Sequence, residues 1–189
     1  MKIFKIVTRI LLAGLILGII YISVSYHMPG DLKADSFMEA EMKHLEELRF
    51  NEKNIEEDVS SAPVAWHLDH ILLTINGIYK TLKESDTTNY HSSLNIPRVV
   101  MFSLNFIPRG RAKSPERVRP KDDVDLITIE KHLEEALQNL NRFDSLPENA
   151  NFIHPYIGQL NREGAKRFLK IHTRHHLKIC DDIILSKKE

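Results

Sequence analysis

The feature that most constrains the fold of this chain is the spacing of its apolar residues. In four stretches they recur every three or four positions, the period that places side chains on one face of an α-helix. The expected helices span residues 34–49, 60–83, 126–143 and 161–185. No stretch alternates apolar and polar residues over a useful length, and no Asn-Gly or Asp-Gly hairpin signal separates two such runs, so strands are not expected. The pattern predicts an all-α fold, a four-helix bundle.

Loops are expected where prolines interrupt this pattern. Residues 94–107 are apolar but irregular, because Pro97 and Pro108 bracket them, and residues 149–158 form a second loop. Between them, residues 108–121 form a basic loop whose cations are Arg109, Arg111, Lys113, Arg117, Arg119 and Lys121. The basic loop is interpreted either as an anion-attracting lid over the end of the bundle or as a solvated surface loop. Runs of charged residues are usually solvated, which favours the surface loop.

An apolar segment precedes the helical region. Residues 10–26 carry no charge, and Lys2, Lys5 and Arg9 come before them. A membrane-spanning helix needs about 20 apolar residues, with roughly 17 as the lower limit. The segment predicts one transmembrane helix within residues 1–30, with a cytoplasmic N-terminus and an exported domain over residues 31–189. The alternative is a signal peptide cleaved near residues 23–25, which would release a secreted protein.

Composition excludes several classes of protein. The 26 basic residues balance the 26 acidic ones, so the chain lacks the net positive charge typical of nucleic-acid-binding proteins. Since the basic loop also lacks interleaved aromatic residues, no nucleic-acid partner is expected. Cys180 is the only cysteine, so an internal disulfide is ruled out. A lone cysteine on a helix is more often a packing residue than a nucleophile. The sequence leaves the oligomeric state open, a homodimer included.

The ten histidines are the strongest indication of chemistry. His172 and His176 lie one helical turn apart, in the middle of the apolar stripe of the last expected helix. A polar side chain facing a bundle interior needs a partner. That partner is a metal ion, a buried hydrogen bond, or water at an open end of the bundle. Two imidazoles at this spacing can bind one metal ion, but a metal site needs at least one more ligand.

The second expected helix can supply the third ligand. It carries two histidines in its first half, of which His70 is the preferred ligand and His67 the alternative. His70, His172 and His176 would form a three-histidine site inside the bundle, with a coordination position free for water or substrate. His175 could replace His176, because spacings of three and four residues are hard to distinguish from sequence. The alternative without a metal has His67 exposed and His70 in an ordinary core contact.

Other polar residues near these histidines have weaker assignments. Asp69 could orient a ligand imidazole, although a solvated position is commoner. His154 could face the mouth of the site or simply organise its loop. No role is assigned to the remaining histidines, which are His27, His44, His91 and His132.

Together these motifs resemble the DinB-like (YfiT-type) metalloenzyme superfamily, and in particular one of its families of unknown function. The resemblance covers nearly all of residues 34–185. It rests on four segments, namely Trp66-His67-Leu68-Asp69-His70, Pro108-Arg109-Gly110 with Lys113-Ser114-Pro115, Phe152-Ile153-His154-Pro155-Tyr156-Ile157-Gly158-Gln159-Leu160, and His172-Thr173-Arg174-His175-His176. The chain departs from that superfamily in its N-terminal apolar segment and in the second histidine of helix two.

The resemblance implies a four-helix bundle that holds a divalent metal, zinc or nickel, on three histidines. Carried onto this chain, these are His70, His172 and His176. The expected function is that of a membrane-anchored, metal-dependent enzyme, a hydrolase or a thiol-dependent transferase, acting on an unknown small molecule. The alternative is a non-catalytic envelope protein whose histidines bind a structural metal or none. Neither a phosphate-binding glycine loop nor a Ser-His-Asp set is visible.

Overall fold

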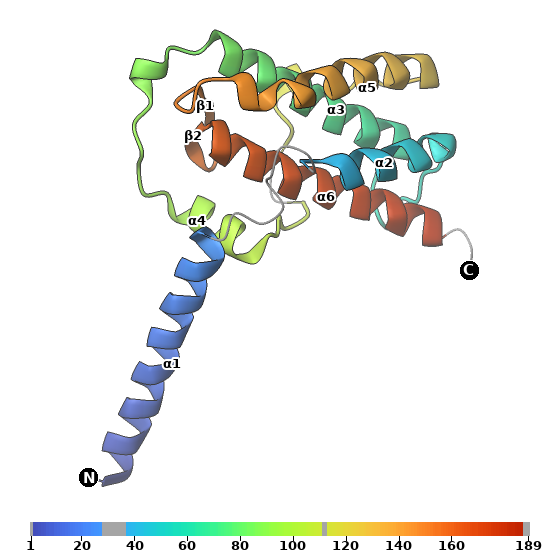
Figure 1. Ribbon diagram of the computed structural model, residues 1–189. Helices are drawn as coiled ribbons and strands as arrows, with labels where there is room; N and C mark the ends of the chain where they lie inside the picture. Colours follow the sequence, from blue (N-terminus) through green and yellow to red (C-terminus); the bar gives the residue numbers. More distant parts are fainter. Residues whose placement is uncertain (1, 28–36, 111–112, 187–189) are drawn as a thin grey trace.

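The protein is mainly helical, with one small β-hairpin (Figure 1). The computed structural model describes residues 2–27, 37–110 and 113–186. Within these ranges the α-helices are α1 (Lys2–His27), α2 (Glu39–Leu48), α3 (Val64–Glu84), α4 (Ile96–Leu104), α5 (Leu126–Asn141) and α6 (Arg162–Ser186). The strands are β1 (Asn151–His154) and β2 (Gly158–Asn161). The expected helical fold is confirmed, and the expected absence of strands is wrong.

Helix α3 lies at the centre of the molecule. It packs against α5 on one side and α6 on the other, and α2 covers α6 (Figure 1). Its apolar stripe, which includes Leu68, Ile71, Leu72 and Ile75, is completely buried. Burying a side chain of this size contributes about 1.5–3 kcal/mol, so this stripe is a major source of the stability of the fold. Histidines on the same helix are therefore held in a rigid frame.

Helix α4 corrects the expectation of an irregular stretch at residues 94–107. Pro97 lies in the first turn of this helix, where its missing N–H has no intrahelical partner to lose. The side chain of Asn95 caps the helix by accepting a hydrogen bond from the backbone N–H of Arg98 at 2.9 Å. The helix ends at Asn105, which adopts the left-handed conformation (φ 48°). Proline thus begins a helix here and does not interrupt one.

The β-hairpin replaces most of the loop expected at residues 149–158. Phe152 pairs with Leu160, and His154 pairs with Gly158, in antiparallel register. Gly158 has a positive φ of 74°, which a side chain would make unfavourable. Ser85, at the end of α3, accepts a hydrogen bond from the backbone N–H of Asn151 at 2.9 Å. The hairpin is therefore attached to the far end of the central helix.

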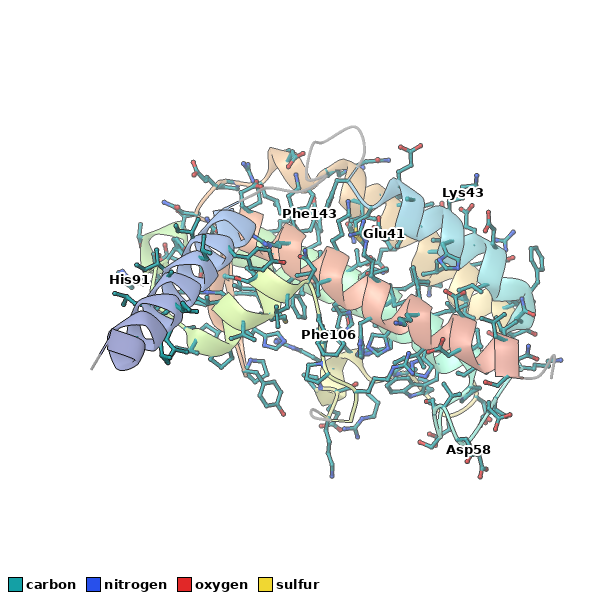
Figure 2. All side chains as sticks on the ribbon, turned by 90° about the horizontal axis from the view of Figure 1, so that it is seen from below. Glu41, Lys43, Asp58, His91, Phe106 and Phe143 are labelled. Atoms are coloured by element: carbon teal, nitrogen blue, oxygen red, sulfur yellow. The ribbon has the colours of Figure 1, made fainter. Side chains whose placement is uncertain are left out.

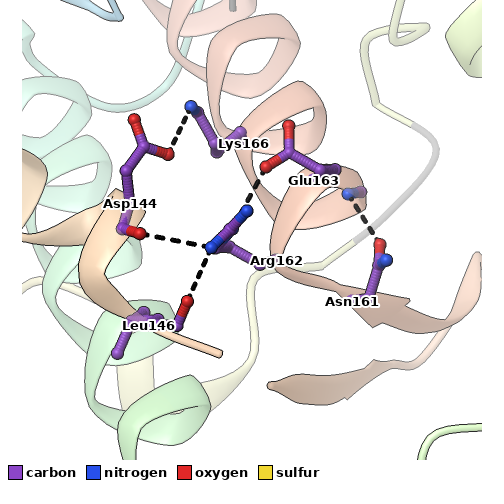
Figure 3. Close-up of polar contacts among 7 residues, drawn as sticks. Asp144, Leu146, Asn161, Arg162, Glu163 and Lys166 are labelled. Carbon is purple, nitrogen blue, oxygen red and sulfur yellow. Dashed lines mark hydrogen bonds and ion pairs between the residues drawn. The ribbon is translucent and has the colours of Figure 1, made fainter. Parts of the chain in front are cut away.

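A set of polar contacts fixes the start of α6 (Figure 3). The guanidinium of Arg162 donates to the backbone carbonyls of Asp144 and Leu146, at 3.2 and 2.6 Å. Lys166 pairs with the Asp144 carboxylate at 2.7 Å, and the side chain of Asn161 accepts from the Gly164 N–H at 3.0 Å. These contacts hold α6 against the segment after α5, and so they set which face of α6 points inward.

Helix α1 extends away from the other helices, and one of its ends lies beside α4 (Figure 1). Its described side chains, between Val7 and Tyr21, are exposed. Among the described residues, no helix combines the length and the apolarity needed to cross a membrane, so the span expected within residues 1–30 is not supported. The domain boundary at residues 30–31, the helix start expected at residue 34 and Arg111 of the basic loop lie outside the described residues.

Candidate metal centre

Three histidines from two helices meet in the interior. His70 comes from α3, while His172 and His176 come from α6, and one ring nitrogen of each lies within 4.8 Å of the others. The ring centroids are 4.6 Å apart for His172 and His176, 4.7 Å for His70 and His176, and 5.0 Å for His70 and His172. His70 and His176 are buried, and His172 is partly buried. These residues, the histidine cluster, are close enough together to bind one metal ion.

His70 is held in a single orientation by its surroundings. Its Nδ1 lies 2.7 Å from the backbone carbonyl of Val118, in the basic loop. Because a carbonyl only accepts hydrogen bonds, Nδ1 must carry the proton, and Nε2 retains a lone pair. The Trp66 ring stacks on the imidazole with centroids 5.1 Å apart and an interplanar angle of 22°. A backbone carbonyl on the second nitrogen is a common way to orient a metal-binding histidine.

His176 has a different partner, which is His67. Their Nδ1 atoms lie 3.0 Å apart, and Nε2 of His67 lies 2.9 Å from the Ser60 hydroxyl oxygen. Two proton arrangements satisfy all three groups, because the Ser60 hydroxyl can accept from Nε2 of His67 or donate to it. In the one that suits a metal site, His67 donates from Nε2 to Ser60 and accepts at Nδ1 from His176, which leaves a lone pair on Nε2 of His176. In that arrangement His67 supports His176 from behind.

His172 has a fully buried nitrogen, Nδ1, that finds no hydrogen-bond partner among the described residues. Its ring packs against Phe168, with centroids 5.3 Å apart. An unpaired buried polar atom costs about 1–3 kcal/mol, so such an atom in a native protein calls for an explanation. A cation at the cluster would provide the missing partner, and the donor set therefore fits a metal ion.

Burial keeps the cluster neutral. It lowers the pKa of His70, an effect opposed by the Val118 hydrogen bond and the nearby Asp69 carboxylate. Burial, and then the proximity of the other histidines, lowers the pKa values of His172 and His176 well below 6.5. The pKa of His67 falls to about 4 for the same reasons. Neutral imidazoles are the form that binds metals, so the cluster is prepared for an ion at neutral pH.

His175 and His154 border the cluster without joining it. The His175 ring lies edge-on to His176 with centroids 5.0 Å apart, and burial lowers its pKa to about 4. Nδ1 of His154 accepts from the backbone N–H groups of Tyr156 and Ile157, at 3.2 and 3.4 Å. The interpretation of His154 as a residue that organises its loop is confirmed, and it also lines the cavity beside the cluster.

Sequence reasoning missed one buried pair beside the site. Asp69 is only 2% exposed, and its carboxylate lies 2.6 Å from Nδ1 of His132 on α5. The expectation of a solvated Asp69 is wrong, and its partner is not a histidine of the cluster. The signal available in the sequence was the position of Asp69 directly before His70 on a buried helix. His132 lies beside the apolar stripe of α5, next to Leu133, and no local pattern shows that its partner is Asp69 on α3.

Cys180 is a packing residue, as expected for a lone cysteine. It is fully buried in the core, and burial raises the pKa of its thiol to about 12. A thiol with such a pKa carries almost no thiolate at neutral pH, and the thiolate is the nucleophilic form. Cys180 therefore supplies no nucleophile to the site.

A cavity of about 800 Å³ opens from the cluster. Cavities of this size typically hold small molecules. Its walls come from α3, α4, the basic loop, the β-hairpin and α6. Phe106, which lines it, lies on the opposite side of α6 from the core residue Phe143 (Figure 2). The cavity borders the apolar core, since the core residues Ile78, Phe152, Ile157 and Phe168 also line it.

The basic loop is attached to this site. Arg109 pairs with Asp182 of α6 at 2.6 Å, and Val118 is buried against α3. The structure thus brings together His70, His172 and His176 as expected, and places His67 and His175 beside them. Comparisons with protein-family models, with curated proteins and with solved structures found no match for this chain.

Proposed function

We propose that this protein is a metal-dependent enzyme in which His70, His172 and His176 bind one divalent ion, zinc or nickel. The observation that carries the proposal is the convergence of three ring nitrogens within 4.8 Å, one of the histidines having a buried Nδ1 with no other partner. Imidazole suits both metals, and three ligands leave a coordination position for water or substrate. The bundle formed by α2, α3, α5 and α6 supports a DinB-like fold.

The choice of His70 over His67 follows from hydrogen bonding. Both nitrogens of His67 already have partners, Ser60 and His176, whereas His70 has Nε2 free. His175 is a poorer ligand than His176, because it lies outside the group of converging nitrogens. We therefore assign His67 as a residue that positions His176.

A catalytic site is favoured over a structural one by its surroundings. Structural zinc sites are closed by four protein ligands, whereas this cluster has three and faces a cavity of about 800 Å³. A bound ion would act as a Lewis acid and would lower the pKa of a coordinated water or thiol. His175 also lines the cavity, and because burial lowers its pKa to about 4, its imidazole is neutral at pH 7 and a weak proton acceptor. The proposed reaction class is hydrolysis or thiol transfer. The export of the domain across the membrane stays a prediction.

The direct test is the metal content of the full chain, purified without chelators and measured by elemental mass spectrometry. One equivalent of zinc or nickel is expected. Replacement of His70, His172 or His176 by Ala should abolish binding, whereas His175→Ala should retain it. His91→Ala is the matched control, since His91 is exposed and remote from the cluster. No stoichiometric metal in the wild type, or full occupancy in His172→Ala, would contradict the proposal.

A further inference from the structure

The cavity beside the histidine cluster is long as well as large. Its lining on α3 runs from His70 through Thr74, Gly77 and Ile78 to Thr81. At a rise of 1.5 Å per residue these positions cover roughly 16 Å of helix. The histidine cluster lies at one end of this length, so an occupant that reaches the cluster can extend far along α3.

The walls along this length are apolar. Helix α4 faces α3 across the cavity with Ile96, Val100, Met101 and Leu104, and the hairpin region adds Phe152 and Ile157. Several of the lining side chains are exposed, among them Ile96 (70%), Leu104 (57%) and Phe106 (59%). Apolar side chains that line a cavity and remain open to solvent are typical of a binding site for an apolar molecule.

The charged lining residues are all basic. Neither Asp nor Glu lines the cavity among the described residues, whereas Lys113 and Arg117 do. In the part of the chain that the structure describes, neither cation forms an ion pair. Arg117 directly precedes Val118, whose carbonyl binds His70, so its backbone lies at the cluster end, and its charge acts on His154 of the cavity wall. An anionic group is the natural partner of such a pair of cations.

We infer that the cavity binds a single-chain amphiphile with an anionic head group. Its head lies between Lys113, Arg117 and the metal position, and its apolar chain extends between α3 and α4. The head-group placement rests on the proposed metal site, whereas the apolar chain and the two cations do not depend on a bound metal. The inference names the substrate class of the site and not its reaction.

The test uses three probes that share one alkyl chain: dodecanoate, dodecanol and dodecyltrimethylammonium. The two ionic probes are titrated below their critical micelle concentrations, and dodecanol below its solubility limit, into the full-length, metal-free protein, and binding is measured by calorimetry. Dodecanoate is expected to bind about tenfold or more tightly than the other two, since two exposed ion pairs together supply an effect of this order. The double variant Lys113→Glu with Arg117→Glu should remove the preference. Lys121→Glu, in the same loop but outside the cavity, should keep it.

A second pair of variants locates the alkyl chain. A Cβ atom at Gly77 would meet only Val118, at an ordinary 3.7 Å, so Gly77→Ala fits, whereas Gly77→Leu fills the cavity. Binding should survive the first change and fall at least tenfold with the second. Val100 is half-exposed and lines the cavity from α4, opposite Gly77. Val100→Trp should therefore weaken binding in the same way. A far-ultraviolet circular dichroism spectrum and a urea midpoint like those of the wild type show that these variants are folded, whether or not the chain binds a metal.

The possible results separate this inference from the proposed function. Equal affinity for the three probes, or binding that Gly77→Leu and Val100→Trp leave unchanged, overturns the inference and locates the probe elsewhere, for instance on the exposed side chains of α1. Dodecanoate binding to the cavity by a chain that binds no metal supports the inference and contradicts the proposed function. A chain that binds metal and shows no preference for dodecanoate contradicts the inference and supports the proposed function.

Discussion

Nδ1 of His67 lies 3.0 Å from Nδ1 of His176, across the contact between α3 and α6. A hydrogen bond between two imidazoles requires one to donate and the other to accept. Ser60 at the far nitrogen of His67 can accept or donate, so both directions are possible. The direction in which His176 donates leaves its Nε2 available to a metal. In the proposed metal site this pair gives each of the two histidines of α3 a role, His70 as a ligand and His67 as the residue that positions His176.

Replacing His67 by Ala should weaken metal binding without abolishing it. Loss of such a supporting partner costs roughly 10- to 100-fold in metal affinity. Ser60→Ala should cost less, because His67 can still accept from His176. Affinity can be measured by competition with a chelator of known strength, using the fluorescence of Trp66, which stacks on His70. His44→Ala is the control, since His44 is another histidine with a side-chain hydrogen bond, to the carboxylate of Asp181, but it lies outside the cluster. Complete loss of metal in His67→Ala would instead make His67 a ligand.

Replacing His172 by Leu should stabilise the metal-free protein while abolishing metal binding. The change removes a buried nitrogen that has no partner, and relief of that cost is worth about 1 kcal/mol. His176→Leu should do the opposite and lower the stability, because it leaves His67 without its partner. Urea unfolding in the presence of a chelator measures both variants. If both were destabilising to the same extent, the unpaired nitrogen of His172 would not be a source of strain.

The metal-free protein should lose stability as the pH falls from 6.5 toward 4. The pKa of His67 is about 4 in the folded state and near 6.5 when unfolded. Between these pH values the unfolded chain binds a proton at His67 that the folded chain does not bind. The contribution of His67 to the free energy of unfolding is therefore complete above pH 6.5 and is lost as the pH falls toward 4. For one buried histidine the full loss is on the order of 3 kcal/mol. Urea midpoints at pH 7, 6 and 5 measure the slope, which His67→Gln should reduce. An unchanged slope in this variant would assign the effect to other groups.

Cys180 should be unreactive in the folded protein. Burial both blocks access and holds the thiol pKa at about 12, so iodoacetamide should modify it only after unfolding in urea. Mass spectrometry before and after unfolding gives the result directly. Cys180→Ala should retain full metal content, since the thiol takes no part in the histidine cluster. Rapid alkylation of the native protein would show that the core opens around α6.

The sequence predicted the long helices and the histidine cluster well, for a physical reason. The apolar stripes of α3 and α6 repeat over many turns, and the histidines interrupt these stripes, which places them inside. The short elements escaped prediction. Four-residue strands such as β1 are too brief for alternation to stand out, and Pro97 suggested a break where it begins a helix. The pairs His67–His176 and Asp69–His132 depend on distances between helices, which no local pattern contains.

The hydrogen bond from His70 to Val118 has a consequence for how molecules reach the metal centre. If the segment around Val118 moved away, His70 would lose the carbonyl that fixes its proton and its orientation. If the basic loop opened to admit a molecule, His70 would lose its orientation at the same time. We therefore do not expect this loop to open during binding. Molecules should enter and leave the cavity on its opposite side, between α4 and the hairpin. Exposed side chains such as Leu104 and Tyr156 border the cavity there. The loop then serves as a fixed wall of the cavity.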